Sequence, residues 1–465
     1  MRKALRSYLL LAAAPLTLAG CGTMSPQRAA KVASGFASQQ LCTAVFVSGL
    51  DGRDVLEQEI KPTYGPAAGL LRTEVDRERK EVRATFAGLV TSRAVYRGAE
   101  GCLGLEGAPP APPVAVTPHP EVSKLAPIAP PESVPPANTA LAAAIDHAFE
   151  EPATAPHRWT KAVVIVHHDK VVGERYAPGY GPATPLSGWS MSKSVTNALI
   201  GVLVRQGKVK VEGTAPLGLW SGATNPRRPI SIDSMLRMTS GLTFGQSLYA
   251  DASSAFDPTS QMVFGTRDMA AYAASAPVGH APGASWTYSN GNTVLLSRII
   301  RDQVGGDARS VMAFAYAELF DKLGMERMTF TVDATGTPVG ASLFVATPRD
   351  WARLGLLYLH DGVIGGERIL PQGWVDYSAK PTPTAEDFGY GAGFWTNRGD
   401  GPAAKARQAG GMPADSFFAR GSYGQAVIVI PSQDLVIVRM GYAFTDRGDI
   451  AALERLTRES IAALH

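Results

Sequence analysis

The chain has 465 residues, of which 45% are hydrophobic and 18% charged, and its formal net charge is +3. This composition supports well-packed cores in two or three domains and excludes fibrous and disordered chains. Arg2, Lys3 and Arg6 supply three positive charges at the very start, so the remainder is close to neutral. No basic patch or RNA-binding motif is evident, and we therefore expect no nucleic-acid partner.

Residues 1–20 have the features of an export signal. A basic start is followed by a short apolar run from Tyr8 to Leu18, too short to span a membrane permanently. The sequence Leu-Ala-Gly-Cys that ends at Cys21 resembles the lipobox of bacterial lipoproteins. We therefore expect cleavage before Cys21, lipid on its thiol, and a protein anchored in the bacterial cell envelope that faces the periplasm. The alternative is an ordinary secretory signal that a cysteine follows by chance.

Two short segments follow the predicted signal. Residues 21–40 are polar with a modest helical tendency and are predicted to be a tether. Residues 41–106 are predicted to form a small β-rich module, since the pattern favours a strand at 42–49 and two more joined by a charged turn. Cys42 and Cys102 would remain as a pair in an oxidising compartment, which predicts a disulfide between them; two buried free thiols are the alternative. The module carries no catalytic signature and is interpreted as a targeting, docking or inhibitory appendage.

The pattern offers no metal site and implies no cofactor. The cysteines lack companions at ligand spacing. His167 and His168 are adjacent on a predicted strand and are expected to point to opposite faces, which favours a structural role.

Residues 107–137 are rich in proline and nearly without charge, which predicts an extended linker; a PxxP ligand is the less common alternative. Residues 138–465 form the predicted catalytic domain. Strand patterns lie near both of its ends, at 161–176 and at 388–441, while helical patterns dominate between them. We therefore predict a mixed α/β domain with an antiparallel sheet built from both ends, flanking helices and an inserted helical subdomain.

The stretch 189–207 is the strongest candidate for a catalytic element. Apolar residues recur at helical spacing, and glycines and prolines upstream place Ser190 near the helix N-terminus. Lys193 follows one turn later on the same face, within reach of the Ser190 hydroxyl. A partly desolvated lysine loses its proton more easily and can activate a serine as a nucleophile. A capped helix with an ordinary surface lysine is the alternative.

Two later motifs could complete a site. Tyr288 and Asn290 lie on a loop before a helical run, where Tyr288 could relay a proton if a neighbouring cation such as Lys193 lowered its pKa. Asn290 could donate a hydrogen bond to a substrate carbonyl. Arg420 and Gly421 end a predicted strand whose edge could pair with a substrate, although a simple glycine turn has the same pattern.

Together, SMSK at 190–193, YSN at 288–290 and the strand edge before GQAVIVIP resemble the penicillin-recognising serine hydrolases, which include class C β-lactamases, DD-peptidases and esterases. The flanking phrases are most similar to the branch with 6-aminohexanoate-dimer hydrolases. The resemblance implies a β-lactamase-like fold and ping-pong acyl transfer. In this scheme Ser190 attacks a carbonyl, Lys193 accepts its proton, Tyr288 assists the leaving group and then water, and Asn290 holds the substrate. The backbone N–H groups of Ser190 and Ser422, which follows Gly421, would bind the oxyanion.

The chain departs from the family pattern where β-lactamases and peptidases carry Lys-Thr-Gly. It has Ala-Arg-Gly at 419–421, so only Arg420 could meet a β-lactam carboxylate. We therefore expect a small-molecule ester or amide substrate, with β-lactamase or DD-peptidase activity as the alternative. Two other readings are an envelope binding protein that no longer deacylates and an inert structural lipoprotein.

Overall fold

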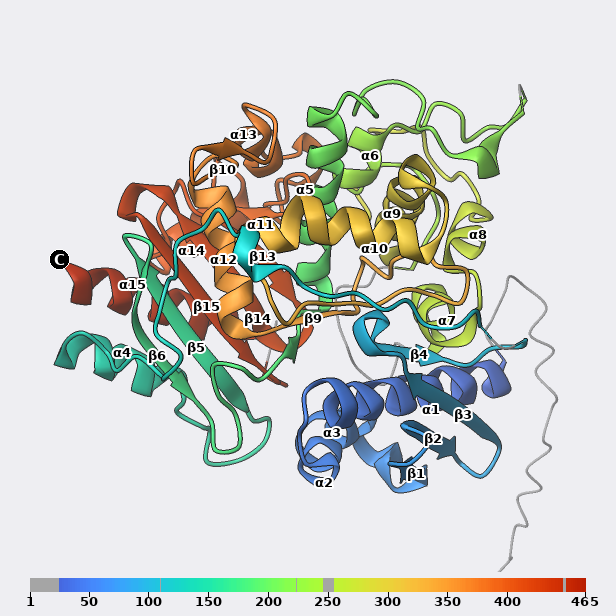
Figure 1. Cartoon of the computed structure of the whole chain (residues 1–465), viewed down its shortest axis with the longest axis horizontal. Helices are drawn as coiled ribbons and strands as arrows, with labels where there is room; N and C mark the ends of the chain where they lie inside the picture. The colour runs from blue at the N-terminus through green and yellow to red at the C-terminus, as the bar shows by residue number, and fades with distance from the viewer. Residues whose placement is uncertain (1–24, 109, 223, 246–254, 446–448) are drawn as a thin grey trace, which may run out of the picture.

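The computed structural model describes residues 25–108, 110–222, 224–245, 255–445 and 449–465. The predicted signal and the lipidation of Cys21 lie outside these residues and stay predictions. No helix in the described ranges is both long and apolar enough to cross a bilayer. Figure 1 shows an N-terminal module of helices and a small sheet set against a larger domain with a central sheet.

The central sheet draws its strands from both ends of the large domain, as predicted. All six strands pair antiparallel, in the order β12-β13-β14-β15-β5-β6. The hairpin predicted to turn at Asp169 is confirmed, because β5 and β6 flank that residue. The strands are β5 (Thr160–His167), β6 (Lys170–Tyr176), β12 (Trp395–Thr396), β13 (Phe417–Gly421), β14 (Gln425–Ile430) and β15 (Leu435–Gly441).

Helices cover both faces of this sheet, and the alternation of its side chains explains why. Val163 and Ile165 of β5 belong to a core with helices α4 and α15, whereas Val164 and Val166 point into the core that contains α12. Because both faces are buried, the central strands are apolar along most of their length, with Arg439 of β15 as a buried exception. The helices are α4 (Thr139–Ala148), α12 (Pro348–Leu359) and α15 (Ile450–Leu464).

The predicted helical insertion lies between β6 and β12 in the chain and to one side of the central sheet (Figure 1). Its central pair is α5 (Ser192–Arg205) and α9 (Asn290–Val304), which pack against each other. A small sheet in the order β7-β9-β8 lies beside α5. The remaining elements are α6 (Ile232–Leu236), α7 (Pro258–Gly265), α8 (Met269–Ala274), α10 (Ala308–Ala315), α11 (Asp321–Leu323), β7 (Leu186–Ser187), β8 (Thr329–Phe330), β9 (Phe344–Ala346), β10 (Val363–Ile364), β11 (Glu367–Arg368), α13 (Trp374–Ala379) and α14 (Pro402–Ala409).

The N-terminal module differs from the prediction in its helices. The tether predicted for residues 21–40 is wrong from Pro26 onward, because Pro26–Cys42 forms helix α1 with 12 of its 17 residues buried. Small side chains let α1 pack closely, and its polar ones find partners inside the module, as in the 2.7 Å hydrogen bond between Ser34 Oγ and Ser92 Oγ. The strand predicted at 42–49 is also wrong, since the chain continues from α1 into a wide helical turn at Thr43–Val47.

The predicted β-strands and the disulfide are present in the rest of this module. Strands β1 to β4 form one antiparallel sheet against α1, and Cys42 at the end of α1 is bonded to Cys102 at the start of β4. The disulfide therefore links helix α1 to the four-stranded sheet of the module. The elements are α2 (Gly52–Val55), α3 (Lys61–Tyr64), β1 (Leu71–Asp76), β2 (Glu81–Phe86), β3 (Val90–Tyr96) and β4 (Cys102–Gly104).

The proline-rich segment 107–137 is extended, as predicted, but it is bound along the large domain. Lys124 N donates to Lys322 O at 2.8 Å, and Val171 N donates to Ile128 O at 2.9 Å. Ile128 is fully buried in the main core. The segment thus behaves as an ordered strap on the domain surface.

Two further local predictions are wrong because the chain turns where a strand was expected to continue. The strand predicted at 388–395 is reduced to Trp395–Thr396, because glycines at 389, 391 and 393 interrupt it. His167 and His168 do not point to opposite faces. His168 has a φ of +49° in the turn, and the two rings lie 3.8 Å apart.

Candidate active site

Ser190 lies in a single 3₁₀ turn, Trp189–Met191, that leads directly into α5. Trp189 has a left-handed φ of +49°, a strained conformation for a large side chain and one that concentrates at functional sites. The turn also packs closely against Trp351 of α12, since a Cβ at Gly188 would lie 2.1 Å from the Trp351 ring. Ser190 is partly exposed while its two neighbours are buried, so the turn presents the Ser190 hydroxyl to a cavity.

Lys193 lies one turn later with its amine beside that hydroxyl. The distance from Lys193 Nζ to Ser190 Oγ is 3.0 Å. Lys193 Nζ also donates to Asn290 Oδ1 at 2.7 Å and to the Ala341 carbonyl at 2.9 Å. Asn290 Oδ1 therefore holds the lysine, and donation from Asn290 to a substrate carbonyl stays a prediction.

Burial sets the protonation of this amine. The Lys193 side chain is only 2% exposed, and desolvation lowers the pKa of Lys193 to about 7. A neutral amine has two N–H bonds and one lone pair. Because Asn290 and Ala341 accept the two N–H bonds, the lone pair is directed at the hydroxyl of Ser190.

Tyr288 approaches the same hydroxyl from an aromatic pocket. The Lys193 Nζ lies 4.8 Å from the centre of the Tyr288 ring, and the Ser190 side chain is close enough to the phenol to act on its pKa. The prediction that a neighbouring cation lowers the pKa of Tyr288 is wrong in its net effect. Burial raises that pKa to about 12, and the Ser190 side chain and the charge of Arg420 offset the rise only in part. Tyr288 is thus a protonated phenol at neutral pH.

The end of β13 closes against the Ser190 turn. A Cβ at Gly421 would lie 2.2 Å from the Gly188 carbonyl, which explains why glycine occupies this position. Ser422 follows immediately, and Ser190, Asn290 and Ser422 all line one cavity of about 460 Å³. Arg420 points elsewhere, with its guanidinium 5.7 Å from the centre of the Trp395 ring, and it is not among the residues that line this cavity.

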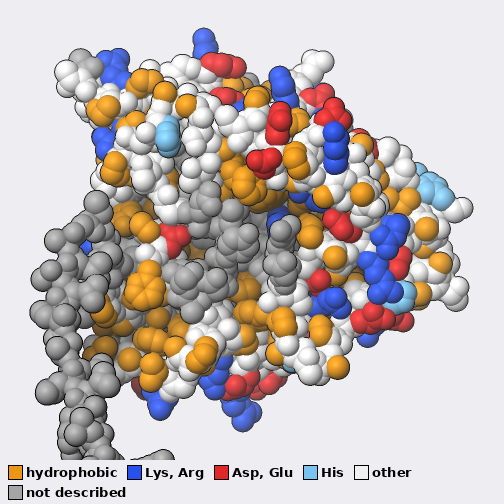
Figure 2. All heavy atoms as spheres, turned by 180° about the vertical axis from the view of Figure 1, so that it is seen from behind, with side chains coloured by type: hydrophobic (Ala, Val, Ile, Leu, Met, Phe, Trp, Pro, Cys, Tyr) orange, Lys and Arg blue, Asp and Glu red, His pale blue; other side chains and the backbone are white. Residues whose placement is uncertain are grey.

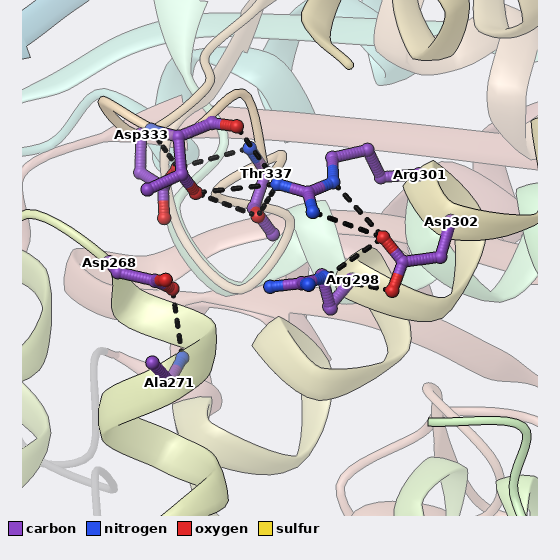
Figure 3. A network of polar contacts seen from close by, with 8 residues as sticks. Asp268, Ala271, Arg298, Arg301, Asp302, Asp333 and Thr337 are labelled. Atoms are coloured by element: carbon purple, nitrogen blue, oxygen red, sulfur yellow. Dashed lines mark hydrogen bonds and ion pairs between the residues drawn. The ribbon is translucent and has the colours of Figure 1, made fainter. Parts of the chain in front are cut away.

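A polar network joins α9 to the loop that precedes Ala341 in the chain (Figure 3). Asp333 accepts a hydrogen bond from the backbone N–H of Thr337 at 3.0 Å, and Arg301 donates to Thr337 Oγ1 at 3.2 Å. Arg301 belongs to α9, the helix that begins with Asn290. The network therefore ties together the two chain segments whose oxygens hold the lysine.

The sequence had no signal for three of these features. Ala341 acts through its backbone carbonyl, which any residue could supply. The left-handed φ of Trp189 has no signature in the sequence, and neither has its contact with Phe36 of α1, whose ring centre lies 6.1 Å away. Ser342 lines the cavity next to Ala341, but an isolated serine in a loop does not distinguish itself.

Comparison with known proteins gives a consistent result. Residues 145–458 match the model of the family described as Beta-lactamase. The 6-aminohexanoate-dimer hydrolase of Paenarthrobacter ureafaciens is 25% identical over 290 residues, which cover 60% of this chain and 72% of that protein.

Solved structures show the same fold. A putative 6-aminohexanoate-dimer hydrolase from Bacillus anthracis has a TM-score of 0.57 at 22% identity, covering 75% of this chain and 90% of that one. EstCE1, a hydrolase with promiscuous acyltransferase activity, has a TM-score of 0.55 at 17% identity, covering 69% and 97%. With more than half of its length matched by the family model, this chain belongs to the β-lactamase family, whose members are hydrolases.

Proposed function

We propose that this protein hydrolyses an ester or amide bond through an acyl-enzyme on Ser190. The observation that carries the proposal is a buried lysine, with a pKa lowered to about 7, whose amine lies 3.0 Å from the Ser190 hydroxyl. Desolvation of this kind makes the amine a base at neutral pH and so activates the serine.

The side chains at the site can perform every proton transfer that the reaction needs. Ser190 Oγ forms a bond to the substrate carbonyl carbon while its proton passes to Lys193 Nζ. As the tetrahedral intermediate collapses, the bond to the leaving alcohol or amine breaks and that group takes up a proton through the Tyr288 phenol, which Lys193 reprotonates. Water then attacks the acyl carbon with the same groups in the reverse sense, releasing the acid and restoring Ser190.

The developing oxyanion needs donors on the opposite side of the carbonyl. We assign this role to the backbone N–H groups of Ser190 and Ser422, because Gly421 lets β13 approach the Ser190 turn closely and both serines line the cavity. Loss of one such donor typically costs on the order of 10²- to 10³-fold in rate.

The charge around the cavity favours esters and simple amides over β-lactams and carboxylate-terminated peptides. Those substrates carry a carboxylate, and no lysine or arginine is among the described residues that line the cavity. The name of one similar protein, a hydrolase with promiscuous acyltransferase activity, is in line with acyl transfer through a serine.

The test is hydrolysis of p-nitrophenyl acetate by the whole chain and by Ser190→Ala. We expect steady turnover that the substitution abolishes, with kcat/KM rising with pH through about 7, because the protonated Lys193 amine has no lone pair to accept the serine proton. Equal activity of a well-folded Ser190→Ala would reject this nucleophile. A burst of one equivalent without turnover would instead identify a binding protein that acylates and stops.

A further inference from the structure

The cavity beside Ser190 has two walls, and only one of them belongs to the catalytic domain. The other is built by the N-terminal module, residues 26–104, which lies outside the segment 145–458 that matches the family. The module wall of the cavity includes Ala29, Ala33, Phe36, Thr63, Leu70 and Leu89.

The module touches the residues next to both proposed oxyanion donors. Phe36 stacks on Trp189, the residue before Ser190, with ring centres 6.1 Å apart and planes 25° apart. Thr63 Oγ1 lies 2.9 Å from the hydroxyl of Tyr423, the next residue after Ser422. These contacts reach the catalytic turn itself.

The module is seated firmly enough to act as a wall. A Cβ on Gly35 of α1 would lie 2.4 Å from the Phe264 carbonyl of α7, so the two helices touch backbone to backbone. Polar contacts extend this interface, including Lys161 Nζ to Gln58 Oε1 at 2.6 Å. A loosely tethered appendage would not show such close packing.

The enclosed space is apolar, and so is its rim. Of the described lining residues only Asp257 carries a charge, and its carboxylate caps α7 by accepting from Thr259 N at 2.7 Å. Leu70, Leu89 and Phe256 line the cavity although 51%, 68% and 57% of their surfaces are exposed. Viewed from behind, hydrophobic side chains gather over the part of the molecule that the module forms (Figure 2). Exposed apolar surface of this kind marks a binding site.

The catalytic wall adds two polar groups that have no partner among the described residues. Trp189 Nε1 and Ser342 Oγ are both buried and unpaired, and both residues line the cavity. A buried donor without a partner is costly, so each is suited to a polar atom of a bound molecule. The site thus combines polar groups near Ser190 with an apolar surface beyond them.

We propose that the N-terminal module completes the active site and that the two walls together accept the hydrocarbon chain of an ester, with the ester group at Ser190. This deepens the proposed function and rests on it. The volume of about 460 Å³ is in the range of ligand pockets that enclose most of their ligand. Each methylene that the module wall buries raises kcat/KM by about two- to four-fold, the upper figure applying to complete burial.

The experiment compares kcat/KM for p-nitrophenyl acetate, butyrate and octanoate, using the whole chain under one detergent condition. Leu70→Ser combined with Leu89→Ser makes the rim polar at exposed positions, where folding is little affected. Ala33→Phe fills part of the module wall. Leu219→Ser is the matched control, because Leu219 is also an exposed leucine but lies outside the cavity.

We expect wild type and Leu219→Ser to favour octanoate over acetate by at least tenfold. The rim variant should lose most of that preference, and Ala33→Phe should lower the ratio of octanoate to acetate activity well below that of wild type and Leu219→Ser. If wild type hydrolyses the acetate ester through Ser190 but shows no chain-length preference, the proposed role of the module is wrong and the proposed function stands. The proposed role of the module is also wrong if the rim variant hydrolyses all three esters faster than wild type, because the module would then obstruct the active site instead of binding the hydrocarbon chain. Ester hydrolysis that Ser190→Ala leaves unchanged rejects the proposed function as well.

Discussion

The protonation of Lys193 can be tested by stability measurements that need no substrate. We propose Lys193→Met, which removes the amine from a site where the side chain is 2% exposed. The folded protein holds this group with a pKa of about 7, against 10.5 for an ordinary lysine. Between these values the unfolded chain binds one more proton than the folded one, so wild-type stability rises with pH across this window.

The size of the effect follows from the same two pKa values. Each pH unit within the window contributes about 1.4 kcal/mol, and allowing for partial titration near pH 7, the wild-type stability gains about 2 kcal/mol between pH 7 and 9. Lys193→Met lacks this gain. The variant also leaves the oxygens of Asn290 and Ala341 without their donor, but that cost does not change with pH.

The assay is urea-induced unfolding followed by tryptophan fluorescence at pH 7, 8 and 9. We expect the difference in unfolding free energy, wild type minus Lys193→Met, to increase by about 2 kcal/mol from pH 7 to 9. All other titrating groups are common to both proteins and cancel. The matched control is Lys405→Met on α14, where the lysine is exposed and the difference should stay flat. A flat difference for Lys193→Met as well would refute the assignment of a neutral base.

Three further predictions concern other parts of the structure. Tyr288→Phe should lower kcat for p-nitrophenyl acetate by about 10²- to 10⁴-fold at unchanged stability, because it deletes only the phenol proton; wild-type kcat would contradict that role. Gly188→Ala should cost about 1–3 kcal/mol in urea unfolding, since its methyl would meet the Trp351 ring at 2.1 Å, whereas Gly181→Ala, with open space around it, should cost far less; equal losses would contradict the packing argument. Replacing both cysteines of the disulfide by alanine should destabilise the N-terminal module by about 4 kcal/mol, given their sequence separation of 60, and unchanged hydrogen exchange at its amides would contradict this role of the bond.

Local spacing was enough to predict the core of the candidate site. Ser190 and Lys193 are one helical turn apart, so any helix at that place brings them together. The hairpin around Asp169 and the final helix were predictable for the same reason, because their periodicity is continuous over many residues.

The failures share a different cause. Helix α1 looked like a polar tether because its serines and glutamines are paired only in the folded module, as Ser34 is with Ser92. The apolar run after Cys42 resembled a strand, but it continues a helix that tertiary packing stabilises. The pKa of Tyr288 was mispredicted because burial, which a sequence does not display, outweighs the nearby charge.

The division of the cavity between two walls also bears on how this protein should be dissected. Trimming the chain to the family boundary near residue 145 would delete Phe36 and Thr63, and with them the ring stacked on Trp189 and one hydrogen-bond partner of the Tyr423 hydroxyl. The shortened chain would also expose the surface of α7 against which Gly35 packs. An inactive fragment of this kind would report the loss of these contacts, so catalysis should be measured on a chain that keeps residues 26–104.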